Sequence, residues 1–310
     1  MKTPKNKLLN RSALTLSFVK DSLGLLFAPD LYKFKNKFKF IKTSIYLAIK
    51  YSKHGSPRLV PSSDVNSAIW RSMNHILRFN LRYTSLPGMI KSPVINAVTS
   101  PNMFNYKIKV KPSNNLNIEK TAKDYAEIFL TDENKFKNAL MYHLNILCTL
   151  FERDNFKFIN SKNILQIGPG LGLLDYFLYL EGAELYSFET NEMSYFQELI
   201  YSQIRKINLE SKVYFRDYSL ISKPFAVISF FAFTELDMCS RELLLSTLKN
   251  ADWIVIVSNA NFEGISNFDY LNNVFSTDFI LKKNFSIGEL GIANMPNYAK
   301  NHEAFLFVKK

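Results

Sequence analysis

The stretch ILQIGPGLG at residues 164–172 constrains the fold more than any other part of the chain. It begins with an apolar run typical of a buried strand, which leads directly into Gly168, Gly170 and Gly172. Glycines at such a point permit a tight turn and let a ligand lie close to the main chain. A helical pattern starts at Leu173. The segment therefore predicts a strand, a ligand-binding glycine loop and a helix.

Strand-like and helix-like segments alternate through the rest of the chain. This alternation predicts a doubly wound, Rossmann-like α/β sheet, in which ligands bind at the carboxyl ends of the strands. Two strands near the end, at 279–285 and 304–309, predict an antiparallel terminal pair. The other predicted strands are 164–167, 184–189, 212–216, 225–231 and 253–257, and the predicted helices are 62–82, 173–180, 192–207 and 241–248. Residues 118–151 also show helical periodicity, with Tyr125 at one of the apolar positions.

The N-terminal part of the chain has a different character. The 310 residues carry a net charge of +12. Residues 1–120 hold 21 Lys and Arg against 4 Asp and Glu, a balance of 21 − 4 = +17, whereas residues 121–310 hold 18 against 23, a balance of −5. We therefore divide the chain into a basic, mainly helical region at 1–117 and a Rossmann-like domain at 118–310. The first region is expected to act as a lid, a substrate-binding segment or a membrane contact.

Residues 31–54 mix lysines with aromatic residues and turn to helical spacing from about Phe38. One interpretation is a basic amphipathic segment on an anionic membrane surface or an acidic partner. The other is a solvated helix whose aromatic side chains dock on the rest of the protein. No nucleic-acid-binding motif accompanies the charge, so no nucleic-acid partner is expected.

The two cysteines, Cys148 and Cys239, show neither a disulfide framework nor metal-ligand spacing. No apolar run approaches the roughly 20 residues of a membrane span. We expect a cytoplasmic protein, at most peripheral to the inner membrane.

Two acidic residues stand where the ends of strands are expected. Glu189 ends the second strand, 17 residues after Gly172, and a carboxylate there can accept hydrogen bonds from both hydroxyls of a ribose. Its alternative role is a favourable charge at the start of the next helix. Asp217 follows the third strand and can bond an adenine amino group or serve as a turn residue.

Residues 160–260 resemble a class I S-adenosylmethionine-dependent methyltransferase. The glycine loop, Glu189 and Asp217 match the cofactor motifs of that superfamily in order and spacing. The resemblance implies S-adenosylmethionine as the cofactor. The family usually has Asp or Glu two residues before the first glycine, where this chain has Gln166. A glutamine can accept a hydrogen bond from the cofactor's ammonium group but lacks the charge.

A narrower resemblance covers residues 228–259, which are similar to the sugar O-methyltransferase family of bacterial surface-polysaccharide clusters. Residues 232–236 (AFTEL) fit its motif at the end of strand four, and Ser258 and Asn259 fit the polar pair that ends its next strand. This resemblance implies a sugar or glycan acceptor that is methylated on a hydroxyl.

A hydroxyl acceptor benefits from a general base. Glu235, with Asp237 close by, follows strand four, and His302 precedes the last strand. The alternatives are a helix cap for Glu235 and an ordinary loop histidine for His302. No metal-ligand cluster is visible, so a metal-independent reaction is expected.

An alternative of a different class is a non-catalytic Rossmann-like module whose basic N-terminal region binds a membrane or an acidic glycan. A nicotinamide oxidoreductase is disfavoured because Leu173 stands where the dinucleotide motif needs its third glycine.

Overall fold

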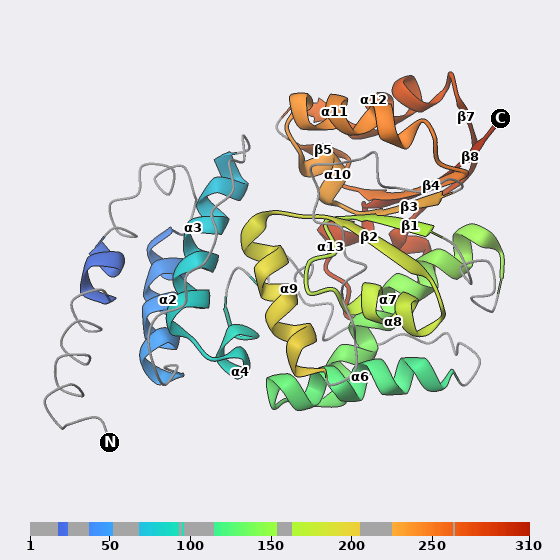
Figure 1. Cartoon of the computed structure of the whole chain (residues 1–310). Helices are drawn as coiled ribbons and strands as arrows, with labels where there is room; N and C mark the ends of the chain where they lie inside the picture. The colour runs from blue at the N-terminus through green and yellow to red at the C-terminus, as the bar shows by residue number, and fades with distance from the viewer. Residues whose placement is uncertain are drawn as a thin grey trace, which may run out of the picture. The chain divides into compact units, whose positions relative to one another are not determined.

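The computed structural model describes residues 18–23, 37–51, 68–92, 95, 115–153, 163–204, 225–262 and 264–310, with the backbone alone at 37–40, 68–72 and 298. The chain divides into two compact units (Figure 1). The first comprises Met1–Pro101, Ile128–Leu130 and Thr190–Ile200, and the second Asn102–Glu127, Thr131–Glu189 and Tyr201–Lys310. The division at residue 117 stays a prediction.

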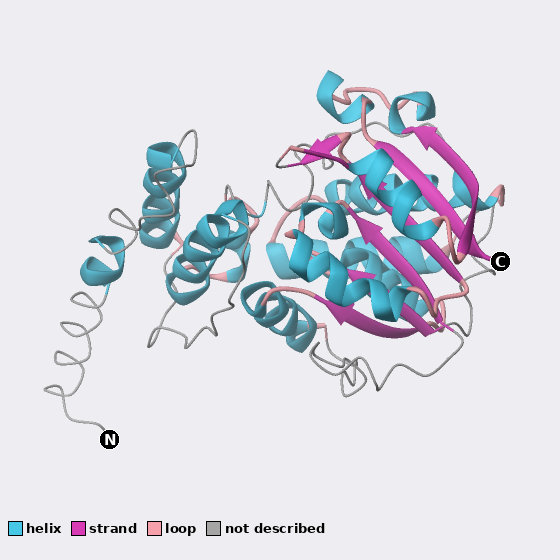
Figure 2. Ribbon diagram, turned by 90° about the horizontal axis from the view of Figure 1, so that it is seen from above, coloured by secondary structure: helices cyan, strands magenta, loops and turns pink. Residues whose placement is uncertain are grey.

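The second unit is built on one six-stranded sheet (Figure 2). Its strand order is β2-β1-β3-β4-β8-β7. The first four of these strands are parallel, and β8 runs antiparallel to both β4 and β7. The strands are β1 (Asn163–Ile167), β2 (Glu184–Phe188), β3 (Phe225–Phe230), β4 (Trp253–Ser258), β7 (Phe279–Ser286) and β8 (Glu303–Lys309). A separate small sheet pairs β5 (Asn261–Phe262) with β6 (Ile265–Ser266).

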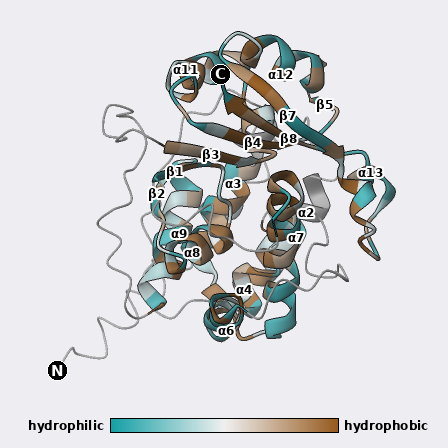
Figure 3. Ribbon diagram, turned by 90° about the vertical axis from the view of Figure 1, so that its right-hand side faces the viewer, coloured by the Kyte–Doolittle hydropathy of each residue, from teal (hydrophilic) through white to brown (hydrophobic). Residues whose placement is uncertain are grey.

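Helices cover both faces of this sheet. In Figure 1, α7 (Glu133–Phe151) and α8 (Leu173–Leu180) lie on one face, and α11 (Met238–Leu248) and α12 (Asn267–Phe275) lie on the other. Because both faces are covered, β3 and β4 are buried at every position, and all their residues except Ser229 and Ser258 are apolar. Figure 3 shows these two strands mostly in the hydrophobic colours. This unit also contains α6 (Leu116–Phe129) up to Glu127, α10 (Ala232–Glu235), the 3₁₀ helix η5 (Ile287–Leu290) and α13 (Asn297–Lys300).

The predicted doubly wound, Rossmann-like fold is confirmed. Each predicted strand that falls within the described residues is found within one residue of its expected bounds, and the terminal strands pair antiparallel as expected. The predicted strand at 212–216 lies outside the described residues, as does Asp217. The helix α12 and the strands β5 and β6 were not predicted. The buried Leu271 and Phe275 of α12 do follow helical spacing, whereas β5 and β6 have two residues each, too few to show a period.

In the first unit, α2 (Lys37–Lys50) packs against α3 (Ala68–Tyr83) and α4 (Leu86–Met89). The predicted helix at 62–82 corresponds to α3, and its first six positions lie outside the described residues. The unit also contains the first turns of α9 (Asn191–Gln203).

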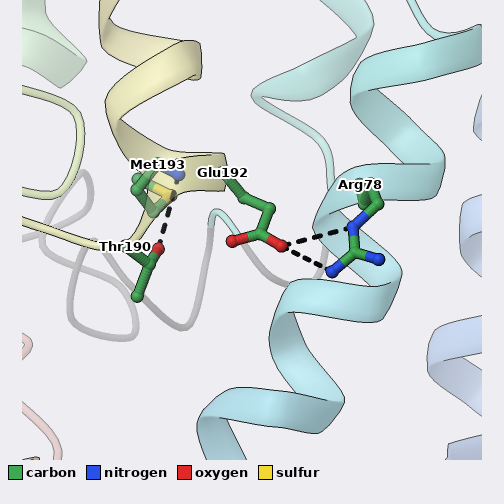
Figure 4. A network of polar contacts seen from close by, with 4 residues as sticks. All are labelled: Arg78, Thr190, Glu192 and Met193. Carbon is green, nitrogen blue, oxygen red and sulfur yellow. Dashed lines mark hydrogen bonds and ion pairs between the residues drawn. The ribbon is translucent and has the colours of Figure 1, made fainter. Parts of the chain in front are cut away.

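Figure 4 shows the ion pair that fixes the start of α9 within this unit. Arg78 of α3 places its Nη2 2.6 Å from Oε1 of Glu192 and its Nε 3.2 Å from the same oxygen. The Glu192 side chain is fully buried. A buried carboxylate needs such a partner, because leaving one charge of a buried pair alone is strongly destabilising.

Candidate functional site

The glycine loop lies at the edge of the sheet where β1, β2 and β3 end. Parallel strands end on the same side of a sheet, and ligands bind there in doubly wound folds. All three glycines of the loop have positive φ, at +66° for Gly168, +57° for Gly170 and +69° for Gly172. A Cβ atom on Gly168 would stand 2.0 Å from Cβ of Ala232. The turns after β1 and β3 are therefore in close contact, and only glycine fits at 168.

Glu189 lies beside this loop. It directly follows β2, and its Oε2 accepts a hydrogen bond from the Gly170 N–H at 3.2 Å. The Gly168 N–H bonds the Phe188 carbonyl at 2.7 Å, which holds the loop against the end of β2. The structure thus brings together the glycine loop and the carboxylate that the sequence singled out. Which hydroxyls Glu189 would accept from stays a prediction.

Gln166 places an acceptor oxygen beneath the loop. Its side chain is buried, and in the parallel register it stands between Ser187 of β2 and Ile228 of β3. Its Oε1 has no hydrogen-bond partner among the residues that the structure describes. The neighbouring Ser187 hydroxyl is hydrogen-bonded to Asp175 at 3.1 Å. Since buried polar atoms are normally hydrogen-bonded, the Gln166 oxygen suits a donor that a ligand brings, such as an ammonium group.

Two tyrosine hydroxyls hold the carbonyl groups at the end of the loop. Tyr125 Oη donates to the Leu171 carbonyl at 2.9 Å, and Tyr201 Oη donates to the Gly172 carbonyl at 3.0 Å. Both side chains are buried, and burial raises the pKa of Tyr125 well above its ordinary value, so it stays a donor. The sequence showed Tyr125 only as one apolar position of a helix, so no sequence signal pointed to this role.

The turn after β3 is strained. Phe231 has φ +69° and ψ −39°, a conformation that is costly for any residue other than glycine. Its N–H bonds the Val257 carbonyl at 2.7 Å, and its carbonyl accepts from the N–H groups of Thr234 at 3.0 Å and Glu235 at 3.1 Å. The Phe231 ring meets the His302 imidazole edge-to-face, with centroids 4.7 Å apart. Strained residues of this kind cluster at functional sites.

Glu235 and His302 reach this same edge of the sheet. Glu235 ends α10, and its Oε1 accepts a hydrogen bond from Asn259 Nδ2 at 3.2 Å. His302 precedes β8, one step beyond the register pair Ser258–Glu303, which places it across from Asn259. Burial lowers the pKa of His302 to about 4, so the imidazole is neutral at pH 7. Their roles in catalysis stay predictions.

The helix cap proposed as the alternative role of Glu235 belongs to Asp237. Asp237 is the N-cap of α11, and its Oδ1 accepts from the Ser240 N–H at 3.1 Å while its Oδ2 bonds the Ser240 hydroxyl at 2.8 Å. The capping interpretation of Glu235 is therefore wrong. Asp237, and not Glu235, accepts the hydrogen bond at the start of α11.

A buried arginine supports the peptide groups around Glu235. Arg241 is fully buried, and it donates to the carbonyl groups of Thr234 and Leu236, on either side of Glu235. It also donates to Asn267 Oδ1 at 3.1 Å, and Asn267 Nδ2 donates to the Asn259 carbonyl at 3.0 Å. The sequence placed Arg241 at the start of a helix and carried no sign that it is buried.

Among the residues that the structure describes, no group of three or more His, Cys, Asp or Glu is arranged to hold a metal ion. The expected metal-independent reaction stays a prediction.

No protein-family model matches the sequence, and no curated protein matches it. Solved structures overlap the chain at low identity. A protein from Thermoplasma acidophilum is 17% identical, with a TM-score of 0.39, over 63% of this chain and 96% of that one. Magnesium protoporphyrin IX methyltransferase from Synechocystis PCC 6803 with bound SAM is 12% identical, with a TM-score of 0.41, over 57% and 83%.

A third structure is phosphoethanolamine N-methyltransferase 2 from Haemonchus contortus in complex with S-adenosylhomocysteine. It is 16% identical, with a TM-score of 0.37, over 54% of this chain and 52% of that one. Likenesses at this level do not transfer a function.

Proposed function

We propose that the chain is an S-adenosylmethionine-dependent methyltransferase that methylates a sugar hydroxyl in the synthesis of a surface polysaccharide or glycan. The cofactor assignment rests on one observation: the Glu189 carboxylate lies beside the glycine loop, with its Oε2 3.2 Å from the Gly170 N–H. Three features suit the parts of S-adenosylmethionine. The positive-φ glycines suit its nucleoside, the carboxylate suits its ribose, and the unpartnered Gln166 Oε1 suits its ammonium group.

Each of these residues would contact a different part of the cofactor. Glu189 would accept from the ribose hydroxyls, Gln166 Oε1 from the ammonium, and the main chain at Gly170 would leave room for the nucleoside. When bound, S-adenosylmethionine supplies a methyl group made electrophilic by its positively charged sulfur. Asp217, expected at the adenine, lies outside the described residues.

The edge beyond β3 and β4 supports a hydroxyl acceptor. Asn259 Nδ2 and Glu235 Oε1 form an adjacent donor and acceptor, the combination that hydrogen-bonds a sugar hydroxyl in both directions. The Phe231 ring offers an apolar face of the kind that packs on the C–H side of a sugar ring. Among the described groups, we assign Glu235 to receive the hydroxyl proton, which would leave as the methyl group passes from the cofactor's sulfur to the acceptor oxygen; the S–C bond would break as the O–C bond forms, with S-adenosylhomocysteine as the leaving group.

The neutral His302 is better placed to position the acceptor than to take its proton. A pKa of about 4 makes its imidazole a weak base, and its ring is already packed edge-to-face against Phe231. The Arg241 contacts to the Thr234 and Leu236 carbonyls fix the backbone from which Glu235 projects. Such support matters because methyl transfer depends mainly on alignment.

Ligand titration tests the cofactor assignment. The full chain should bind S-adenosylhomocysteine and S-adenosylmethionine and should not bind NAD. At 100 times the dissociation constant, either sulfur nucleoside should add about 2.7 kcal/mol of stability. Absence of binding by both would overturn the proposal and would favour the non-catalytic module.

A labelled-methyl assay tests the acceptor assignment. The chain would be incubated with S-adenosylmethionine labelled in its methyl group and a panel of nucleotide sugars and oligosaccharides. We expect label in a sugar ether, with Glu235→Gln losing about 100-fold in rate while its affinity for S-adenosylhomocysteine is unchanged. Transfer to amines or carboxylates, with sugars unlabelled, would contradict the sugar assignment and leave the cofactor assignment standing.

A further inference from the structure

The helix α2 carries two opposite faces. Its buried face consists of Ile41, Ser44, Leu47 and Ala48, which are 0–3% exposed. This face packs against α3, where Asn80 Nδ2 bonds the Ser44 hydroxyl at 3.3 Å. The packing of α2 within its own unit is therefore complete on one side, and the opposite side is left to solvent.

The exposed face combines positive charge with large apolar side chains. Lys42, Tyr46, Ile49 and Lys50 are all exposed, Tyr46 to 53% and Ile49 to 65%. At about 100° per residue these four positions fall within an arc of roughly 100° on the helix surface. Ile49 and Tyr46 are three positions apart on the helix and lie between lysines, so this face combines apolar area with positive charge.

Further lysine contacts extend this face beyond α2. Lys50 Nζ lies 5.4 Å from the centre of the Tyr46 ring and 5.6 Å from that of Tyr51. The exposed Lys91 places its Nζ 4.5 Å from the centre of the Tyr51 ring and donates a hydrogen bond to its hydroxyl. α2 itself has no acidic residue in its sequence, KFKFIKTSIYLAIK. We call the set Lys42, Tyr46, Ile49, Lys50 and Lys91 the α2 face.

We propose that the α2 face docks on an anionic membrane surface. Lysines attract acidic lipid headgroups, while a tyrosine and an isoleucine between them enter the headgroup boundary, as in interfacial amphipathic helices. A nucleic-acid backbone would use the charges but has no place for the exposed Ile49 side chain. This docking would be peripheral: among the described residues, no helix is long and apolar enough to cross a membrane. The proposal does not depend on the methyltransferase assignment.

Co-sedimentation of the full chain with vesicles tests how much the lysine charges contribute to membrane binding. We expect binding to vesicles of phosphatidylglycerol and phosphatidylethanolamine that weakens with added salt, and little binding to phosphatidylcholine vesicles. The pair Lys42→Gln/Lys50→Gln should lower the partition coefficient about 30-fold. The matched pair Lys249→Gln/Lys282→Gln removes the same charge from exposed positions of the other unit and should have little effect.

Single substitutions test how much the exposed Ile49 side chain contributes to membrane binding. Ile49→Ser should lower partitioning about tenfold, whereas Ile280→Ser, which changes an isoleucine exposed to 57% on β7, should leave it unchanged. Both variants should keep the far-ultraviolet circular dichroism of the parent. Three results would each overturn the proposal. They are equal binding to neutral and anionic vesicles, equal losses of binding in the control variants, and displacement by an oligonucleotide together with no effect of Ile49→Ser.

Discussion

Two turns leave the same edge of the sheet, and they obtain positive φ angles in different ways. The turn after β1 uses glycine at 168, 170 and 172, where the conformation costs little. The turn after β3 places Phe231 at φ +69° and holds it with backbone hydrogen bonds and the His302 ring. The turn after β1 (the glycine turn) thus adopts positive φ angles without strain, whereas the turn after β3 (the phenylalanine turn) keeps a strained residue in place. Glycines in the sequence predict the first kind of turn, whereas no local pattern in the sequence predicts the second.

Gly168→Ala should break the contact between the two turns and produce the largest effect. The new methyl group would meet Ala232 Cβ at 2.0 Å, at a φ of +66° that alanine rarely adopts. We expect a loss of about 4 kcal/mol in the free energy of unfolding, measured by urea denaturation. Gly291→Ala is the matched control, because Gly291 has φ +61° with no atom within 4 Å of the added methyl, and it should cost about 1 kcal/mol. Equal costs would show that close packing at 168 is unimportant.

Glu189→Gln should separate the glycine turn's ligand role from its structural role. Losing a charged acceptor beside Gly170 should weaken S-adenosylhomocysteine binding between about 10-fold and 100-fold in calorimetric titration, with little change in thermal stability. Glu184→Gln, at the opposite end of β2, serves as the control and should leave affinity unchanged. If both variants bind the ligand as the parent does, Glu189 has no part in binding it.

Tyr125→Phe and Tyr201→Phe should loosen the glycine turn without touching the phenylalanine turn. Each removes one hydroxyl that bonds a loop carbonyl and keeps the ring that fills the core. We expect about a 3-fold to 10-fold loss of S-adenosylhomocysteine affinity for each variant, and faster hydrogen exchange of the loop amides. Tyr179→Phe, at a partly exposed position of α8, is the control. Faster exchange throughout the sheet would point to general destabilisation instead.

The phenylalanine turn can be probed through the titration of His302. Burial lowers the pKa of His302 to about 4, from an ordinary value of 6.5, so the unfolded chain binds this proton more tightly. Stability from this group is therefore complete above pH 6.5 and is lost as the pH falls toward 4. Phe231→Ala should uncover the imidazole and raise its pKa by about one unit, measured by NMR titration. An unchanged pKa would show that the Phe231 ring does not shield it.

These variants also mark what could be predicted from the sequence. The strands and the glycine turn were predictable because their signals are local: an apolar run, three glycines, and a carboxylate where the next apolar run ends. The geometry of Phe231 depends on Val257 and His302, which are distant in sequence, and no local pattern reports it. The Asp237 cap was missed because two carboxylates stood near one helix start, and only the structure shows which accepts the Ser240 N–H.

A crystal structure of the full chain with S-adenosylhomocysteine tests the central claim most directly. We expect the ribose hydroxyls on Glu189, the amino group on Gln166 Oε1, and the nucleoside against the main chain at Gly170. A ligand bound elsewhere, with no contact to Glu189, would contradict the cofactor assignment.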